Sequence, residues 1–502
     1  MSAPLVQTGV SSGTDAKRHL MMPMTACSSP PSLRHHECIP MDQHSLGVTP
    51  TERYLALLCK RTFLSLWSYP NVHRDEFIPG THTGKEVCDL LDDRIIIFSD
   101  KDCAVSPTAN LNVLWARWFR KSVLESLKQV RGAERWIRTS PHRLFLDKEC
   151  RRPLPALPTV TASTRIHLVI GTHKIASYYR ERYGGSGSLM INFALKGKAA
   201  HIEPFAIGDL NPGGSYVHIL DDTSLPIIMT EFDTIRDFVA YLDRREDFAR
   251  SSGNFFAAGE EELLAVYLKG VDETGEHAFI IPREPAPIGV GEGGYAAYLS
   301  SPQRREKIKA DEMSYFWDKL IEGLTGHVLT DTLYSSAPGG VAAAEKLLRF
   351  MARESRLRRR HLARNLVEAM TIGTNTERRL RVLLPSMPGD PYYFFLRLRR
   401  SENMSYEEYR RHRLIYIRDT ARVVRWRWPD AVDVIGIARE GDDNPQGRAH
   451  DAIYADFRRW TAADEVLARE FQSQTGVLAD PVAIRQIECE YPEVSATEGA
   501  TR

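Results

Sequence analysis

The 502-residue sequence has no apolar run that approaches the roughly 18–20 residues of a membrane-spanning helix. Its first residues also lack the basic segment followed by an apolar segment that marks a secretory signal. The seven cysteines are odd in number and include no Cys-x-x-Cys pair, which argues against a disulfide framework and a zinc ribbon. We therefore expect a cytoplasmic protein with reduced thiols and no membrane partner.

The motifs of several enzyme classes are also missing from the sequence. It has no GxxxxGK[ST] phosphate loop, which argues against an ATP-driven motor, and no GxSxG, HExxH or kinase signature. The segment GGSGS at 184–188 is interpreted as a flexible connection, because it precedes a predicted strand rather than a helix. Five histidines have no partner at metal-ligand spacing and are assigned no role, namely His142, His167, His173, His201 and His218.

The composition is that of a globular protein, with 43% hydrophobic and 26% charged residues. The length predicts two or three domains. Pro-rich stretches at 151–164 and 282–294 indicate the boundaries. The predicted order is a disordered tail at 1–48, an α/β domain at 49–150, an α+β domain at 165–281, a basic α/β domain at 295–490 and a disordered tail at 491–502.

The basic domain contains one predicted βαβ unit. Its first strand is 392–400 and its second is 431–439. Between them Ser405 opens a helix, and Glu408 completes a capping box at its first turn. A strand, a helix and a strand at this spacing form a crossover, so we expect the two strands to be parallel.

Charge is unevenly distributed along the chain. The segment 345–427 holds 21 Lys and Arg against 9 Asp and Glu, a net charge of +12, whereas the whole chain carries +1 and the rest therefore −11. A segment this basic suggests a surface that faces a polyanion. The alternative is that its arginines pair with the acidic regions of the same chain or of a partner protein.

The segment GKEVCDLLDDRIIIFSDK, at 84–101, contains two short apolar runs around an acidic turn. The second run, Ile-Ile-Ile-Phe, is apolar on both faces of a strand, which predicts a central strand covered on both sides. Asp89 lies inside the first run, where burial of a carboxylate is costly unless a cation or a hydrogen-bond donor meets it. Charged residues gather where the second strand ends.

A helix with an early Glu, followed by a hairpin with Asp in one strand and an acid-x-Lys pattern in the next, resembles the core of the PD-(D/E)XK (restriction-endonuclease-like) nuclease superfamily. The resemblance covers about residues 50–148. It implies that Glu52 and Asp89 are catalytic acids and that Lys101 is the catalytic lysine. Such a site holds Mg²⁺ or Mn²⁺ on hard oxygen ligands and hydrolyses a phosphodiester bond.

The motif departs from the family pattern at one position. Ser99 stands two residues before Lys101, where the pattern has an acid. The second metal ligand beside Asp89 is then Asp100 through a β-bulge, Glu86 from the facing strand, or Glu52 from the helix. A site without a second acid would be a degenerate fold that does not cleave.

The resulting prediction is a multidomain α/β and α+β protein that acts as a metal-dependent nuclease on DNA or RNA, in bacterial defence or DNA processing. The alternative is a non-catalytic nucleic-acid-binding or scaffold protein, and a protein partner or homo-oligomer stays open. The helix after the hairpin and the basic segment would face nucleic acid through Arg117, Arg120, Lys121, Arg356, Arg359, Arg360, Arg364, Arg410 and Arg411.

Overall fold

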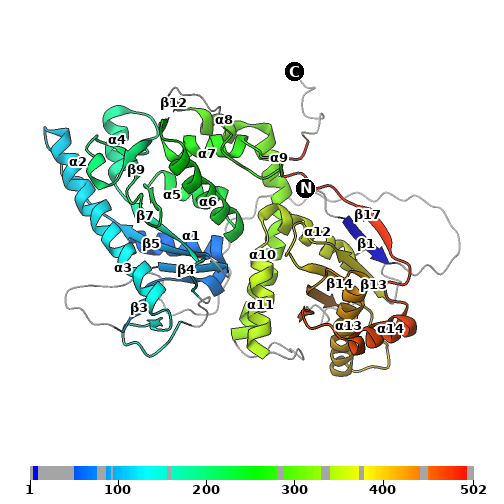
Figure 1. Cartoon of the computed structure of the whole chain (residues 1–502). Helices are drawn as coiled ribbons and strands as arrows, with labels where there is room; N and C mark the ends of the chain where they lie inside the picture. Colours follow the sequence, from blue (N-terminus) through cyan, green and yellow to red (C-terminus); the bar gives the residue numbers. More distant parts are fainter. Residues whose placement is uncertain are drawn as a thin grey trace, which may run out of the picture.

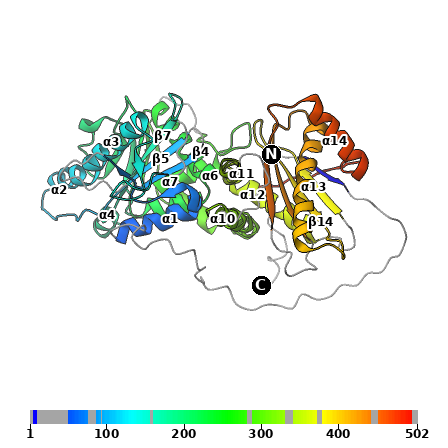
Figure 2. The ribbon, with the colours of Figure 1, turned by 90° about the horizontal axis from the view of Figure 1, so that it is seen from below.

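The computed structural model describes residues 4–8, 50–75, 86–91, 94–154, 160–280, 287–329, 340–371, 378–440 and 450–493. Its helices and strands form a mixed α/β architecture built on a five-stranded and a six-stranded sheet, with a four-stranded and a two-stranded sheet beside the first. Helices α10 (Tyr315–Leu329), α11 (Gly340–Ala352) and α12 (Arg356–Thr371) lie between the two large sheets (Figures 1 and 2). No helix in the described ranges is long and apolar enough to cross a membrane.

The five-stranded sheet has the order β10-β7-β5-β4-β2. Strands β5, β7 and β10 are mutually parallel, whereas β4 is antiparallel to β5 and β2 is antiparallel to β4. The strands are β2 (Ser68–Tyr69), β4 (Glu86–Leu91), β5 (Arg94–Lys101), β7 (Arg165–Thr172) and β10 (Val217–Leu220).

Strand β5 is the covered central strand that its sequence predicts. Ile95 and Ile97 pack into one hydrophobic core, together with the helix that follows β5. Ile96 and Phe98 pack into a second core on the opposite face. The first face is covered by α2 (Leu111–Phe119), a π-helical turn (Arg120–Leu124) and α3 (Glu125–Thr139), and the second by α1 (Pro50–Trp67), α5 (Ser224–Glu231) and α6 (Ile235–Ser251).

The predicted boundary at 151–164 does not separate two sheets. Strands β5 and β7 lie on either side of it in the chain and pair in parallel from Arg94–Arg165 to Lys101–Thr172. A strand buried on both faces requires a neighbour along each edge, and β7 supplies the second one. The predicted units 49–150 and 165–281 therefore share one sheet and one core.

A smaller four-stranded sheet extends this part of the molecule, with the order β12-β11-β8-β9. The strands are β8 (Met190–Lys196), β9 (Ala206–Asp209), β11 (Phe255–Ala257) and β12 (Ile288–Val290). Helices α4 (Ile175–Tyr183), α7 (Glu260–Lys269) and α8 (Gly294–Ser300) accompany it. A two-stranded sheet pairs β3 (His73–Arg74) with β6 (Leu144–Phe145).

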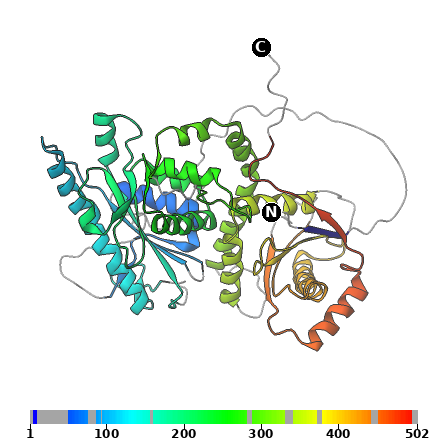
Figure 3. The same cartoon turned by 45° about the horizontal axis from the view of Figure 1, so that its top comes forward.

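Helices link this part to the second large sheet. They are α9 (Pro302–Asp311), α10 (Tyr315–Leu329), α11 (Gly340–Ala352) and α12 (Arg356–Thr371). Apolar side chains of α10, α11 and α12 join the core that contains Phe98 and residues of α6, and that core continues to Tyr393 and Phe395 of the second sheet. The two sheets lie apart with these helices between them (Figure 3), and one hydrophobic core includes residues of both sheets.

The six-stranded sheet has the order β16-β15-β14-β13-β1-β17. Its strands are β1 (Pro4–Thr8), β13 (Arg378–Leu383), β14 (Tyr392–Leu398), β15 (Asp433–Arg439), β16 (Asp451–Asp456) and β17 (Val482–Arg485). Strands β14 and β15 are parallel and are joined by α13 (Tyr406–Arg427), with the capping box of Ser405 and Glu408 in place. The predicted βαβ unit is confirmed, and α14 (Ala462–Thr475) packs beside α13.

The predicted disordered tails contain ordered residues. Within 1–48, Pro4–Thr8 forms β1 and pairs with β13 and β17, which places it beside the red β17 strand in Figure 1; residues 9–49 lie outside the described ranges. Within 491–502, Tyr491 packs against the core that contains the linking helices. The six-stranded sheet therefore includes residues from near the start of the sequence, and the core of the linking helices includes a residue from near its end.

Candidate functional site at the carboxyl edge of the five-stranded sheet

The carboxyl ends of β5, β7 and β10 meet at one edge of the sheet, because these three strands are parallel. In open α/β sheets this edge is where functional side chains collect. Charged and polar residues end or directly follow each strand, namely Asp100 and Lys101 at the end of β5 with Asp102 after it, His173 and Lys174 after β7, and Asp221 and Asp222 after β10. We refer to this group as the edge cluster.

Asp100 and His173 form the centre of the edge cluster. Asp100 Oδ1 lies 2.6 Å from His173 Nε2, and the two side chains are 3% and 12% exposed. Asp100 Oδ2 is buried and has no hydrogen-bond partner in the part of the chain that the structure describes. Gly171 keeps this space open, since a Cβ at that position would lie 3.0 Å from Asp100 Oδ1.

The surroundings of His173 hold its imidazole ring close to several carboxylates. Burial acts to lower the pKa of His173, but the hydrogen bond and charge of Asp100, with the charges of Asp222 and Asp102, outweigh burial and raise it. A buried carboxylate bonded to one ring nitrogen fixes the orientation of the ring. This arrangement suits an imidazole that accepts and releases a proton.

The loop that carries His173 is fixed by two further carboxylates. Lys174 has a positive φ of 69° and its ammonium lies 2.7 Å from Asp102. The Asp222 carboxylate accepts hydrogen bonds from the backbone N–H groups of Lys174 and Ala176, each at 3.2 Å, and so caps the start of α4. One ammonium group therefore lies next to His173 in the chain, at a defined position.

Lys101 lies on the opposite side of the sheet from His173. Its Nζ is 3.6 Å from Glu125 of α3, and the neighbouring Ser99 hydroxyl bonds the side-chain oxygen of Gln129 on the same helix at 3.2 Å. The pairing of β5 with β7 is regular through Lys101, so no bulge turns Asp100 towards the lysine. The prediction that Asp100 acts with Lys101 as a metal ligand is wrong in this respect, because Asp100 is the hydrogen-bond partner of His173.

The backbone register also separates Asp89 from Lys101. Asp89 pairs with Ile95, at the turn end of the hairpin. Lys101 is six residues further along β5, which corresponds to about 20 Å of strand. The prediction that Asp89 and Lys101 converge on one catalytic point is therefore wrong, because the register of β4 and β5 places their backbones at opposite ends of β5.

The two other predicted acids lie elsewhere. Glu86 pairs through its backbone with Phe98, two residues from Asp100, while the side chains of Glu86 and Asp89 lie outside the described set. Glu52 lies in the first turn of α1, on the sheet face opposite to Lys101. Among the described side chains, no three or more His, Cys, Asp or Glu are grouped to hold a metal ion.

The helix that follows the hairpin carries an unpaired basic face. Six exposed side chains of α2, the π-helical turn and α3 make up this basic face: Arg117, Arg120, Lys121, Lys128, Arg131 and Arg135. None has an ion-pair or hydrogen-bond partner for its side chain within the described ranges. The opposite side of the helix buries Trp115, Trp118 and Val123 in the core. Arg117, Arg120 and Lys121 are thus exposed, and their predicted contact with nucleic acid stays a prediction.

Lys101 joins the helix that carries the basic face to the edge cluster. Its ammonium lies 3.6 Å from Glu125 of α3, four residues after Lys121. Asp102 follows Lys101 directly in the chain and lies 2.7 Å from the ammonium of Lys174. These two contacts lead from α3 to the residue next to His173.

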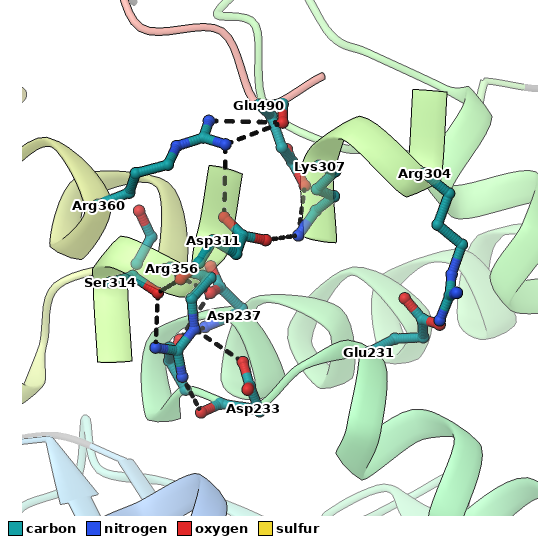
Figure 4. Close-up of polar contacts among 12 residues, drawn as sticks. Glu231, Asp233, Asp237, Arg304, Lys307, Asp311, Ser314, Arg356, Arg360 and Glu490 are labelled. Carbon is teal, nitrogen blue, oxygen red and sulfur yellow. Dashed lines mark hydrogen bonds and ion pairs between the residues drawn. The ribbon is translucent and has the colours of Figure 1, made fainter. Parts of the chain in front are cut away.

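The basic residues of α12 are buried in ion pairs instead of facing solvent. Arg356 contacts Asp233 and Asp318, each at 2.8 Å, and Arg359 contacts Asp318 at 2.6 Å. Figure 4 shows Arg356 directed at Asp233 and Arg360 directed at Asp311 and Glu490. Arg360 and the half-exposed Arg364 also pair with Glu488 at 3.0 and 2.9 Å.

The arginines of α13 follow the same pattern. Arg410 and the buried Arg413 bond the carboxylate of Asp451 at 2.5 and 2.6 Å. Arg411 forms an exposed i,i+4 pair with Glu407 at 2.6 Å. The predicted nucleic-acid contacts of Arg356, Arg359, Arg360, Arg364 and Arg410 are therefore not supported, because acids of the same chain occupy these side chains, and Arg411 is paired as well.

Comparison with protein-family models, with curated proteins and with solved structures finds no match to this chain. The resemblance to the PD-(D/E)XK superfamily stays a prediction. His173 has no predicted role, because it has no partner at metal-ligand spacing along the chain. A usable signal was nonetheless present, since Asp100, His173 and Asp221 each directly follow or end an apolar strand segment, and the ends of parallel strands share one edge.

Proposed function

We propose that the protein binds the phosphate backbone of nucleic acid through the basic face of α2 and α3. The observation that supports this proposal is the run of six exposed cations without side-chain partners in the described chain, from Arg117 to Arg135. Lysine and arginine that neutralise phosphates release counterions, which supplies most of the affinity for nucleic acid irrespective of sequence.

The spacing of these cations suits an extended polyanion. Lys128 and Arg135 are seven residues apart in α3, so they lie two helical turns apart on the same side, and Lys121 precedes them in the π-helical turn. The 18 residue steps from Arg117 to Arg135 cover about 27 Å of helix. A linear array of this length matches several successive phosphates of one strand, whereas a small anion would engage only one or two of the cations.

The local acids do not neutralise this face. Glu125 is the exposed acid among these helical turns and it faces Lys101. Glu134 is mostly buried, and its carboxylate is bonded by Arg138 and Ser215. The basic face therefore keeps a strong net positive charge, and its phosphate contacts would lie in solvent, where salt screens them.

The test is a salt titration of binding. Single-stranded RNA, single-stranded DNA and duplex DNA of about 25 nucleotides are titrated with the full chain by fluorescence anisotropy, between about 50 and 200 mM salt. Six contacts predict a slope of log K against log salt of about −4 to −5. The triple variant R117Q/K121Q/K128Q should lose about half of that slope.

The matched control removes three exposed cations elsewhere, as K309Q/R411Q/R469Q. These side chains are 61%, 59% and 62% exposed, and each pairs with an acid of its own helix. The control changes the net charge by the same amount and should leave the slope unchanged. Equal losses for the two triple variants would show a diffuse effect of net charge and would contradict a binding site on α2 and α3.

The metal-dependent nuclease predicted from the resemblance is a second candidate. Glu86 of β4 pairs through its backbone with Phe98 of β5, and Asp100 is two residues after Phe98. Glu86 therefore lies near the end of β5 that carries Asp100. A requirement for Mg²⁺ or Mn²⁺ in a cleavage assay would favour this candidate, and Glu86→Gln should then abolish cleavage while binding persists.

A further inference from the structure

The edge cluster offers the parts of an acid–base site beside the proposed nucleic-acid surface. We propose that His173, oriented by Asp100, is a general base that cleaves RNA bound on the basic face, with Lys174 as the general acid. This inference rests on the proposed nucleic-acid binding and adds a catalytic residue and a substrate class to it.

The geometry of the pair selects one ring nitrogen for catalysis. Nε2 of His173 is engaged by Asp100 Oδ1 at 2.6 Å. With the Nε2 proton donated to that carboxylate, Nδ1 carries the free lone pair, and it has no hydrogen-bond partner in the described chain. A buried carboxylate behind an imidazole stabilises the imidazolium that forms when the ring takes a proton.

The proposed step needs no reactant besides the RNA. Nδ1 of His173 takes the proton of a ribose 2′-hydroxyl, and the 2′-oxygen forms a bond to the adjacent phosphorus. The bond from phosphorus to the 5′-oxygen breaks, and the Lys174 ammonium donates a proton to the departing oxygen. The products are a 2′,3′-cyclic phosphate and a 5′-hydroxyl end, and both side chains recover their protonation states by exchange with water.

RNA is favoured over DNA by what the edge cluster supplies. RNA carries its own nucleophile next to the phosphorus, so a base and an acid in fixed positions are sufficient. The described side chains at this edge provide an oriented imidazole and an ammonium group, held at 2.7 Å from Asp102. A DNA strand would in addition require a positioned water molecule.

The position of the edge cluster also allows a bound strand to reach it. Lys101 lies 3.6 Å from Glu125 of α3, and the next residue, Asp102, lies 2.7 Å from Lys174. A backbone that follows the basic face towards the amino-terminal half of the helix would therefore arrive at the carboxyl edge of β5 and β7. The cations of α2 then act on binding and His173 acts on chemistry.

The test compares three strands of one sequence in the presence of EDTA. These are RNA, RNA with 2′-O-methyl groups, and DNA, each incubated with the full chain and analysed for product ends. We expect cleavage of RNA with cyclic phosphate and 5′-hydroxyl ends, and binding without cleavage of the other two. His173→Gln retains an amide donor for Asp100 but cannot act as a base, so its rate should fall by at least about 100-fold with unchanged binding.

The control variant is His142→Gln, an exposed histidine at the other end of α3. It should cleave at the wild-type rate, and it is purified in parallel so that a contaminating ribonuclease would appear equally in all samples. Cleavage that is equal in wild type and His173→Gln would overturn the assignment of His173, and so would cleavage of the 2′-O-methyl strand.

The pH profile distinguishes a base from a structural histidine. The groups around the ring are Asp100, Asp102, Asp222 and Lys174, and the carboxylates hold the pKa of His173 above its ordinary value of 6.5. A base must be neutral, so the rate should rise with pH through that raised pKa. Asp100→Asn removes the largest raising contribution and should move the rising limb to lower pH, an effect that loss of structure would not produce.

The outcomes separate this inference from the proposed function. Binding of RNA with no cleavage by wild type would overturn the role of His173 and leave nucleic-acid binding intact. Failure to bind any of the three strands would overturn the proposed function itself, and with it this inference. Cleavage that appears only with Mg²⁺ or Mn²⁺ would assign the chemistry to a metal site and would also overturn this inference.

Discussion

The chain contains two arginine-rich helical regions, α12 with α13 and α2 with α3, and they use their charge in opposite ways. In α12, Arg359 and Arg360 are completely buried and bonded to Asp318 and Glu488. In α2 and α3, cations such as Lys121 and Arg131 are exposed and have no partner in the described chain. The first region is the more basic in sequence, and the second is the better candidate for a polyanion.

The difference shows that the density of basic residues does not identify a nucleic-acid surface. Buried arginines need carboxylates, and the acidic remainder of the chain supplies them to α12. Those pairs hold α12 against α6 and α10, because Asp233 precedes α6 and Asp318 belongs to α10. The charge of α12 therefore contributes to the joint between the two large sheets, and only an unpaired, exposed set remains available to a ligand.

The largest expected effect is on the joint. Arg356→Met leaves Asp233 and Asp318 without their buried cation, which should lower the free energy of unfolding by about 3–5 kcal/mol. Urea unfolding followed by tryptophan fluorescence measures it. Arg411→Gln, which removes an exposed pair, should change the free energy of unfolding by less than about 0.5 kcal/mol. Equal effects of the two variants would contradict the difference proposed between buried and exposed arginines.

Charge reversal on the basic face should act on binding alone. Lys121→Glu with Lys128→Glu should weaken RNA binding by at least about tenfold at 100 mM salt, because two attractive contacts become repulsive. Anisotropy measures the affinity, and the urea midpoint should stay at the wild-type value. A fall in stability without a fall in affinity would show that this face is structural, like α12.

Acid should weaken the joint through Asp233. Burial acts to raise the pKa of Asp233, but Arg356, Tyr315 and Arg61 outweigh it and hold the pKa below its ordinary value of 3.8. The folded carboxyl therefore binds its proton less readily than the unfolded one, and its stabilising contribution, complete above the ordinary value, is lost as the pH falls through the folded pKa. Unfolding measured from pH 5 to 3 should show this loss, and Arg356→Met should make the dependence shallower.

The smallest expected effect concerns Arg364, which the sequence placed on the nucleic-acid surface. Its guanidinium is half-exposed and pairs with Glu488 at 2.9 Å. Arg364→Gln should change the RNA affinity by less than about twofold, since this side chain is already neutralised within the chain. A loss comparable to that of a basic-face variant would show that the pair opens to receive a phosphate.

The elements that the sequence predicts well depend on local signals. The Ser405 and Glu408 capping box and the βαβ crossover lie within one stretch, and both are present. The alternation of Ile95 to Phe98 between two covered faces follows from strand geometry alone. In each case the residues that decide the structure are neighbours in the chain.

The features that the sequence does not predict depend on partners that are distant in the chain. Arg356 and Asp233 are 123 residues apart, and nothing near either of them indicates the pair. The pairing of β5 with β7 crosses the Pro-rich stretch that suggested a domain boundary. His173 is a candidate base because it contacts Asp100, which the parallel register of β5 and β7 brings to the same edge of the sheet. Spacing along the sequence could not predict this contact.

The segment from Gln486 to Tyr491 has a consequence for the order in which the protein is made. The backbone oxygens of Cys489 and Glu490 accept hydrogen bonds from Arg360, which is 129 and 130 residues earlier in the chain. At a synthesis rate of about 5–20 residues per second, roughly 6–26 seconds pass between the synthesis of Arg360 and the synthesis of these partners. A nascent or truncated chain without this segment leaves Arg360 with Asp311 but without Glu488 and the two backbone oxygens, so only a chain translated past Glu490 can complete the joint between the two sheets.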